Sequence, residues 1–544
     1  MSARRYFRIC RGGISMEEQQ SKELEKVELQ KAEPSKAAEP LEKPKSEPQN
    51  VTPKPKKEKT IYQQKIKENY GQFVLTCILF AFFYVLGEYK IEAGLGVLLA
   101  TTAQLACCFA IIKQWGIKIK KSSILYVGMI FVLSVVMLWT NYYFLHFLQK
   151  KLILVLFIVI MFHQLYEERK WSLKTYLYNF LLLIFGSIAS LFQPIEDMIE
   201  QGKKKEKQKW SYIFLGLGIG LPLTFIIVAM LMSADDVFKN MIITLLGNLF
   251  LPQNMIIVLF LFLSGFWLFY CFISALAKNE SGESKIKQAE PMIAITFTSI
   301  LLFVYVLFCG IQILYLFAQK GNLPQEYTYA AYARKGFFEL LFVSIINFLM
   351  LVICNLKFRK SKVLDIILTA VSICNGIMII SSAYRMMLYV EAYHMTIMRM
   401  LVLWFLAMLA VSMIGVIYSI YKKEYKLYRY LFLVLFLFVT GISILKPGAF
   451  VVKYNLEHMN YYTKWDIYNW MDLSYDIVPE LTKIDVHKIV LEDEAPQEKT
   501  EAKQEIIKEY LTSVIKDYEQ RSIRGYHIGM ENAYKAAKKY LQEH

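Results

Sequence analysis

The chain has 544 residues, of which 56% are hydrophobic and 20% are charged, and its formal net charge is +16. Its mean hydropathy is +0.35, and many apolar runs reach the ~18 to 20 residues that a helix needs to cross a bilayer, which excludes a soluble multidomain protein. The lysines and arginines lie mainly in short stretches between these runs, as the positive-inside rule predicts, so the charge does not indicate a nucleic-acid partner.

Residues 1–71 are predicted to form a disordered basic leader on the cytoplasmic side. Residues 1–15 are basic but lack an apolar core of ~7 to 15 residues, so they are not a secretory signal, and the change of composition at Met16 suggests that translation starts there. The stretch up to Lys59 is rich in Glu, Lys and Pro and has almost nothing to bury, which is typical of disorder. The lysines of residues 54–67 are expected to stay cytoplasmic and to contact anionic lipid.

Residues 72–445 are predicted to form a transmembrane helical bundle, and the fold class is therefore all-α. Apolar runs of spanning or near-spanning length follow one another along this region. The predicted spans are Phe73–Leu86, Ile91–Ile112, Ile124–Leu145, Leu152–Leu165, Tyr212–Met232, Leu251–Ala277, Met292–Phe317, Phe337–Asn355, Val363–Ala383, Met398–Ile420 and Tyr430–Leu445.

Charge decides the topology, because short loops rich in Lys and Arg stay in the cytoplasm. A cytoplasmic leader requires an even number of crossings before the basic segment Lys203–Lys209. The apolar run Tyr176–Phe192 therefore does not cross, and we predict an interfacial or re-entrant helix there. About eleven spans remain, with ten to twelve as the range, and residues 233–250, 318–336 and 385–397 lie on the outer face together with the C-terminus.

Residues 446–544 are predicted to form a small soluble helical domain, extracytoplasmic by the topology above. Helical patterns are present in YNLEHMNYYTKW and in EAKQEIIKEYLTSVIKDY, where apolar residues recur at i and i+4. A last helix is predicted over Met530–Leu541, and Glu492–Gln504 is predicted to be a linker.

Four segments resemble bacterial polytopic membrane proteins of the domain-of-unknown-function 4153/4173 type. They are SADDVF from Ser233, YAAYARKGFFELLFVSIIN from Tyr329, YRMMLYVEAYHMTIMR from Tyr384 and DIYNWMDLSYDIVPEL from Asp466. The resemblance covers about the C-terminal two thirds of the chain and implies a membrane bundle. At His394 the family tends towards glycine, which puts a strict backbone role there in doubt. Because the family has no established activity, the resemblance implies no catalytic residue.

A candidate polar site at the outer mouth of the bundle is predicted from ionisable and amide groups, which are costly near hydrocarbon and usually face a bundle interior or a wet cavity. Glu339 and Asn347 are about 80° apart around a helix, so both are expected to face one interior neighbour. The structural alternative is an ion pair and an interhelical hydrogen bond. The candidate residues are Asp235, Asp236, Tyr332, Arg334, Glu339, Asn347, Arg385, Glu391 and Arg399.

Two pairs among these residues have alternative interpretations. If the segment between them is helical, Arg385 and Arg399 lie on one stripe of the helix and would bind a phosphate or anionic headgroup. In the alternative interpretation, both arginines flank a membrane span and extend to the membrane interface. Asp235 and Asp236 would bind a cation or supply a general base, or one of them caps a helix.

Motifs for phosphate-loop, zinc-helix or kinase chemistry are missing from the sequence, and the histidines are scattered. We therefore predict no catalytic residue, no cofactor and no metal, although enzymatic activity stays an open question. The favoured function is a non-enzymatic sensor, scaffold or accessory component of the bacterial cytoplasmic membrane, with membrane lipids and a protein bound through the C-terminal domain as partners. The alternatives are a secondary transporter, indicated by Asn347, Asn375 and Gly376, and a lipid-linked transferase.

Overall fold

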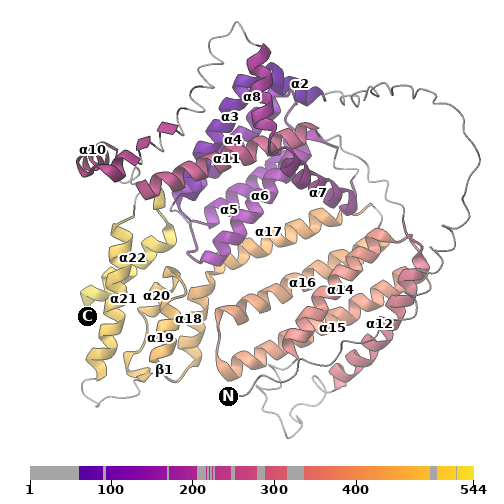
Figure 1. Cartoon of the computed structure of the whole chain (residues 1–544). Coiled ribbons are helices and arrows are strands. Elements are labelled where there is room, and N and C mark those ends of the chain that lie inside the picture. The colour runs from indigo at the N-terminus through magenta and orange to yellow at the C-terminus, as the bar shows by residue number, and fades with distance from the viewer. Residues whose placement is uncertain are drawn as a thin grey trace, which may run out of the picture. The chain divides into compact units, whose positions relative to one another are not determined.

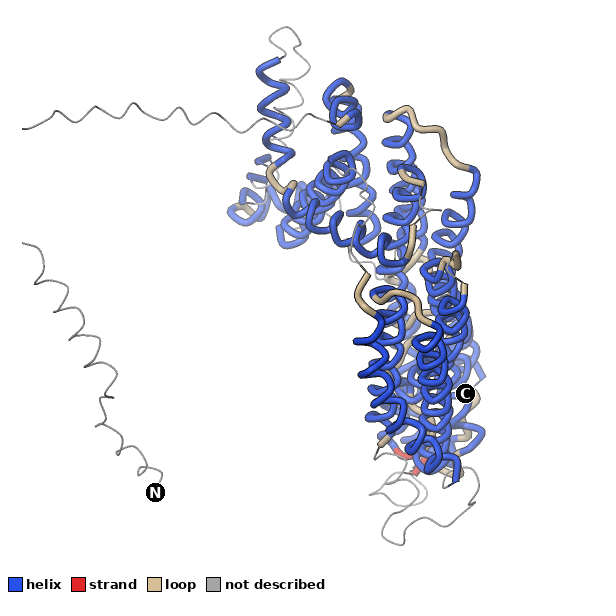
Figure 2. The backbone as a smooth tube through the Cα atoms, turned by 90° about the vertical axis from the view of Figure 1, so that its right-hand side faces the viewer, coloured by secondary structure: helices blue, strands red, loops and turns tan. Residues whose placement is uncertain are grey.

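The computed structural model describes residues 60–89, 93–167, 171–204, 230–246, 252–278, 288–314, 336–422, 424–490, 499–521 and 523–543, with a few positions between 216 and 228. The disorder predicted for the leader up to Lys59, most of the predicted span Tyr212–Met232, and the site residues Tyr332 and Arg334 lie outside the described residues. Nearly all of the described chain is helical, as Figure 2 shows, so the predicted all-α class is confirmed.

Nine helices in the described part of the chain are long and apolar enough to cross a membrane, and a tenth span exists if the bent pair α7 and α8 counts as one. These nine helices confirm the predicted polytopic bundle (Figure 1). They are α3 (Tyr70–Glu88), α4 (Leu95–Gln114), α6 (Tyr143–Leu165), α11 (Pro252–Lys278), α12 (Pro291–Gln312), α14 (Phe337–Lys357), α15 (Lys362–Tyr393), α16 (Ile397–Tyr421) and α17 (Leu427–Leu445).

Several boundaries differ from the prediction. The leader does not extend to residue 71, because α2 (Ile61–Glu68) begins with a capping box at Thr60. The third and fourth spans meet earlier than predicted, since α5 (Ile124–Val136) ends before a break at residues 137–142 and α6 follows. Finally, α15 has 32 residues, or about 48 Å at 1.5 Å per residue, which exceeds the ~30 Å hydrocarbon thickness.

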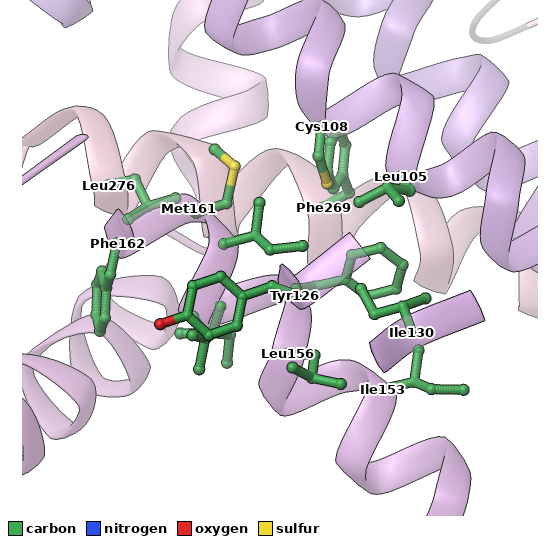
Figure 3. Packing of buried hydrophobic residues seen from close by; sticks show 14 of the residues in the cluster. Leu105, Cys108, Tyr126, Ile130, Ile153, Leu156, Met161, Phe162, Phe269 and Leu276 are labelled. Atoms are coloured by element: carbon green, nitrogen blue, oxygen red, sulfur yellow. The ribbon is translucent and has the colours of Figure 1, made fainter. Parts of the chain in front are cut away.

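The buried hydrophobic residues form two main cores within the bundle. One core joins α3, α4, α5, α6, α7 (Leu173–Ala189) and α11, and Figure 3 shows Tyr126 and Ile130 of α5 among residues of α4, α6 and α11. The other core joins α12, α14, α15 and α16, which pack side by side. Helix α17 contributes to both cores, with Val439 in the first and Leu427 in the second, and so connects them.

Side-chain hydrogen bonds gather the basic segments at one end of the helices, here called the basic end. Lys65 donates to the carbonyl of Trp115 after α4, and Lys120 donates to that of His163 near the end of α6 at 2.6 Å. Thr60 donates to the carbonyl of Ala277 at the end of α11. Helices α4, α6 and α11 therefore all end where α2 lies.

Both ends of α7 lie at the basic end. Its first residues follow Trp171, whose carbonyl accepts from Lys426 at 3.4 Å, and its C-cap Ser190 accepts from Lys278 at 3.2 Å. A bend of 58° then leads into α8 (Gln193–Lys204), where Glu200 pairs with Lys67 of α2. These contacts favour a re-entrant or interfacial α7 over a broken span, as the charge pattern predicts.

Residues 446–490, 499–521 and 523–543 form a helical domain with its own hydrophobic core, in which Trp470, Leu481, Leu511 and Met530 are buried. The predicted helices are present, and a parallel pairing of two short strands, β1 with β2, is an unpredicted addition. Helix α21 begins at Lys499, inside the predicted linker. The elements are α18 (Pro447–His458), β1 (Tyr462–Thr463), α19 (Lys464–Met471), η5 (Tyr475–Ile477), α20 (Val478–Leu481), η6 (Val486–Lys488), β2 (Ile489–Val490), α21 (Lys499–Glu519), η7 (Ile523–Gly525) and α22 (Ile528–Glu543).

Candidate functional site

Asn347 is fully buried on α14 and is the centre of a hydrogen-bonded group between helices. Its carbonyl oxygen accepts from the Tyr305 hydroxyl at 2.7 Å, and its amide donates to Asn375 at 3.2 Å. The amide of Asn375 donates to the carbonyl of Ser344 at 3.3 Å. Glu339 is exposed, so the prediction that Glu339 and Asn347 face one interior neighbour is wrong. About two turns of helix separate them, and only Asn347 faces α12 and α15.

Replacing Asn347 with leucine is expected to destabilise the bundle by about 1–2 kcal/mol, because the Tyr305 hydroxyl and the Asn375 amide would lose their partner in a buried site. Thermal unfolding of the full chain in a detergent micelle measures this loss. Ser372→Ala is a matched control, since the buried Ser372 hydroxyl donates to the Leu368 carbonyl of its own helix. Equal stability of the two variants would contradict a role for Asn347 in holding helices together.

The two arginines of the predicted anion-binding stripe lie on different helices. Arg385 is buried on α15 and donates to Gln312 at 3.3 Å. The chain turns back at His394, whose φ is 64°, so Arg399 lies on α16, where it donates to the Tyr393 carbonyl at 2.6 Å. The condition for a shared stripe, an unbroken helix between the two arginines, is therefore not met, and Arg399 caps the end of α15 instead. His394 occupies a backbone conformation with positive φ that favours glycine.

The remaining predicted residues are not brought together. Asp235 accepts from the backbone N–H of Phe238 at 2.8 Å and so caps α10 (Asp236–Leu246), which is the structural alternative for that pair. Asp236 and Glu391 are exposed. Their positions do not form one site with Asn347 in the described part of the chain.

A different polar cluster, here called the junction, joins the bundle to the C-terminal domain and is centred on Asp476 of η5. Asp476 is buried, and its Oδ2 accepts from the Thr140 hydroxyl at 3.0 Å and from the Asn141 backbone N–H at 2.5 Å. Thr140 and Asn141 lie in the break between α5 and α6. A carboxylate that accepts these two donors fixes the break where it stands, which explains why the third predicted span ends early.

The charge of Asp476 faces Lys446, the residue between α17 and α18. The Lys446 ammonium lies 3.6 Å from Asp476 Oδ1 and 4.7 Å from the centre of the Trp139 ring. Burial raises the pKa of Asp476, while the Asn141 N–H, Lys446 and Thr140 act in the opposite direction. Helix α22 approaches closely because of Gly529, where a Cβ atom would lie 2.5 Å from Asp476 Oδ1.

Two buried histidines meet at the carbonyl of Thr140. His146 Nε2 lies 2.6 Å and His527 Nε2 lies 2.9 Å from this oxygen, and the ring centroids are 6.0 Å apart. His527 Nδ1 accepts from the backbone N–H of Met530 at 3.2 Å at the start of α22. Nε2 therefore carries the only proton of His527, since Nδ1 acts as an acceptor. Burial lowers the pKa of His527 to about 4, and His146 adds to this shift.

The domain contacts three connections between helices, all at the end of the bundle opposite the basic end. Arg524 donates to the carbonyl of Tyr89 after α3 at 3.0 Å, and the Ile528 N–H donates to Leu138 after α5 at 2.9 Å. Asn455 exchanges two hydrogen bonds of 2.9 Å with the backbone of Met395 between α15 and α16. The domain is therefore fixed to the bundle at several points.

Sequence reasoning missed the junction because its members are far apart along the chain. Thr140 and Asp476 are separated by 336 positions, and no local pattern relates them. One signal was available: the polar pair Thr140 and Asn141 interrupts the apolar run that was predicted as a single span. A polar interruption of this kind is costly in hydrocarbon and indicates a break.

The fold and the junction together define a class: a polytopic all-α membrane protein with a helical C-terminal domain fixed to one end of its bundle. The chain matches the family model described as "Domain of unknown function (DUF4153)" over residues 127–484 and belongs to this family. The matched region begins in α5 and ends just after α20, so it includes Thr140 and Asp476 but not His527. Searches of curated proteins and of solved structures found no match.

Proposed function

We propose that the protein is a non-enzymatic component of the bacterial cytoplasmic membrane that presents its C-terminal domain to a protein partner, as a scaffold, sensor or accessory subunit. The observation that carries this proposal is the junction around Asp476, where buried polar contacts fix the domain to the bundle. A domain fixed in this way keeps one orientation towards the membrane, which a partner requires for a defined complex.

The basic end supports an extracytoplasmic position for the domain. Basic short segments remain in the cytoplasm, and Lys65, Lys120 and Lys426 gather at the end of the helices away from the domain. The proposed topology is therefore the one predicted from charge, with α2 inside and the C-terminal domain outside.

The partner surface is proposed to lie on α19 and the preceding turn. Trp465 is 74% exposed and Tyr461 is 62% exposed, and Tyr468 lies one turn further along α19. Exposed Trp and Tyr side chains are enriched at protein interfaces because they combine a large apolar area with a polar group.

Cysteine labelling of intact cells tests the topology. A reporter at the exposed position Asp485 is expected to react with an impermeant maleimide, whereas a reporter at exposed Lys118 reacts only after permeabilisation. The cysteines of the described chain are buried and give a low background. Protection of the Asp485 reporter would place the domain inside and contradict the proposal.

Site-specific photocrosslinking tests the function. A photoreactive residue at Trp465 is expected to give a discrete protein adduct in native membranes. The same photoreactive residue at the exposed position Lys516 on α21 is the control and is expected to give no such adduct. The adduct should weaken in an Asp476→Ala background, in which the domain is no longer fixed. Crosslinking at Trp465 to lipid alone would contradict the proposed scaffold.

A secondary transporter is the second candidate, and buried Asn347 and Asn375 favour it, because amides near the middle of a membrane bundle can bind a solute. These two amides, however, bond each other and Tyr305, which is typical of interhelical contacts. A transferase that uses Asp235 or Asp236 has weaker support, since Asp235 caps α10.

A further inference from the structure

A groove of about 390 Å³ opens on the side of the bundle between α12 and α14, near the basic end. Ile346, Leu349 and Ile353 are about half exposed along its floor. In a chain that spans a membrane, such a surface faces the acyl chains of lipid. The lining residues are Phe297, Ile346, Leu349, Met350, Ile353, Cys354, Lys357 and Phe358.

Backbone hydrogen bonds hold the two walls of the groove together at the basic end. The Ala289 N–H donates to the carbonyl of Lys357 at 2.9 Å, and the Arg359 N–H donates to the carbonyl of Ala289 at 3.0 Å. This bridge joins the start of α12 to the end of α14. The position of the Lys357 backbone is therefore fixed relative to the groove before any ligand binds.

Lys357 is the one charged residue in the lining, and it forms no ion pair with any residue that the structure describes. The next cations along the chain are engaged, because Arg359 pairs with Glu290 at 3.0 Å and Lys360 donates to the Ile420 carbonyl at 2.6 Å. The lysine side chain combines an apolar stem with a terminal ammonium, so it can line the groove and still reach the headgroup layer.

We propose that this groove binds one acyl chain of an anionic phospholipid, and that the Lys357 ammonium binds the phosphate of its headgroup. Basic pockets between membrane helices on the cytoplasmic side recognise anionic headgroups in this manner. The site lies at the end of the bundle opposite the junction, so it is independent of the proposed function of the C-terminal domain. The preference over zwitterionic lipid comes from the net negative charge of the anionic headgroup.

Native mass spectrometry of the full-length protein, released from mixed phosphatidylglycerol and phosphatidylcholine, tests the site. Wild-type protein is expected to retain phosphatidylglycerol in preference to phosphatidylcholine. Lys357→Gln is expected to lower that preference about fivefold, because one charge near the headgroups contributes about 1 kcal/mol. Lys362→Gln is the matched control, since Lys362 is an exposed lysine at the same end but outside the groove. Equal loss in both variants would show general attraction of the basic end and overturn the proposal.

Filling the groove separates acyl-chain binding from headgroup attraction. Ile353→Trp is expected to reduce retention of both lipids, whereas Phe338→Trp, at an exposed position on the same helix outside the groove, leaves retention unchanged. Unchanged retention in the Ile353→Trp protein would overturn the groove as the binding site. Thermal unfolding of each variant identifies any that fail to fold, and Ile353→Phe then replaces Ile353→Trp.

Discussion

Asp476→Ala is expected to release the C-terminal domain from the bundle, with a loss of about 3–5 kcal/mol of docking free energy. The substitution leaves the partly buried Lys446 without its counter-charge, and it leaves the buried Thr140 hydroxyl and the partly buried Asn141 N–H without an acceptor. Removing one partner of a buried pair costs more than the pair contributes, because the other charge stays desolvated. Hydrogen exchange at residues 137–142 and 528–530 of the full chain measures the release.

Asp517→Ala is the matched control for this prediction. Asp517 belongs to the same domain and accepts from the Tyr475 hydroxyl at 2.6 Å, but this pair is exposed. Its loss is expected to cost no more than about 1 kcal/mol and to leave exchange at the junction unchanged. If Asp476→Ala protein retained the protection of wild-type protein at residues 137–142, the junction would not hold the domain.

Acidification from pH 6.5 towards pH 4 is expected to weaken docking of the domain by up to about 3 kcal/mol through His527. Burial lowers the pKa of His527 to about 4 from 6.5, so the undocked state takes up a proton that the docked state excludes. The contribution of His527 to the docking free energy is therefore fully present above pH 6.5 and is lost as the pH falls from 6.5 towards 4. The geometry gives the same sign, since a proton on Nδ1 would face the Met530 N–H donor.

Asp476, the titratable carboxyl of the junction, opposes the response of His527. Burial raises the pKa of Asp476, so the docked state still holds a proton at pH values where the free carboxyl has lost it, and this effect favours docking as the pH falls through the raised pKa. The charge of Arg521 adds to the lowering of the pKa of His527. The ring of His146 lies at the same Thr140 carbonyl, and protonation of one of the two histidines disfavours protonation of the other.

His527→Asn isolates the contribution of this histidine. Asparagine is a favoured N-cap whose amide oxygen can accept from Met530, but it does not titrate. Spin labels are placed at the exposed positions Tyr143 and Lys539, and the distribution of distances between them is followed from pH 7 to pH 4.5. This distribution is expected to broaden in wild-type protein and to change less in the variant. Identical pH profiles would show that His527 is not the group that responds.

The sequence was sufficient for most of the described helices and for the fold class, because a long apolar run has few alternatives to a membrane helix. Runs such as Met398–Ile420 and Tyr430–Leu445 agree with α16 and α17 within a few residues. The predicted end at Ala383 missed the last ten residues of α15, because a helix that leaves the bilayer loses its apolar character but not its backbone hydrogen bonds.

The candidate site was harder to predict because it depends on tertiary contacts. Asn347 was recognised since an amide in a long apolar run is conspicuous, whereas the exposure of Glu339 depends on which helix faces packs against α15. Asp476 and His527 are ordinary polar residues in an ordinary helical domain. Their burial becomes visible only once the domain meets the break between α5 and α6.

The separation of 336 positions between Thr140 and Asp476 has a consequence for biosynthesis. Helices α5 and α6 enter the membrane long before the ribosome has made η5, so the turn between them must wait with its donors solvated until nearly all spans are inserted. The last step of assembly is then a closure between early and late parts of the chain, which is slow because of its high contact order. Chains that terminate before residue 476 would retain an unfinished turn that cellular quality control can recognise.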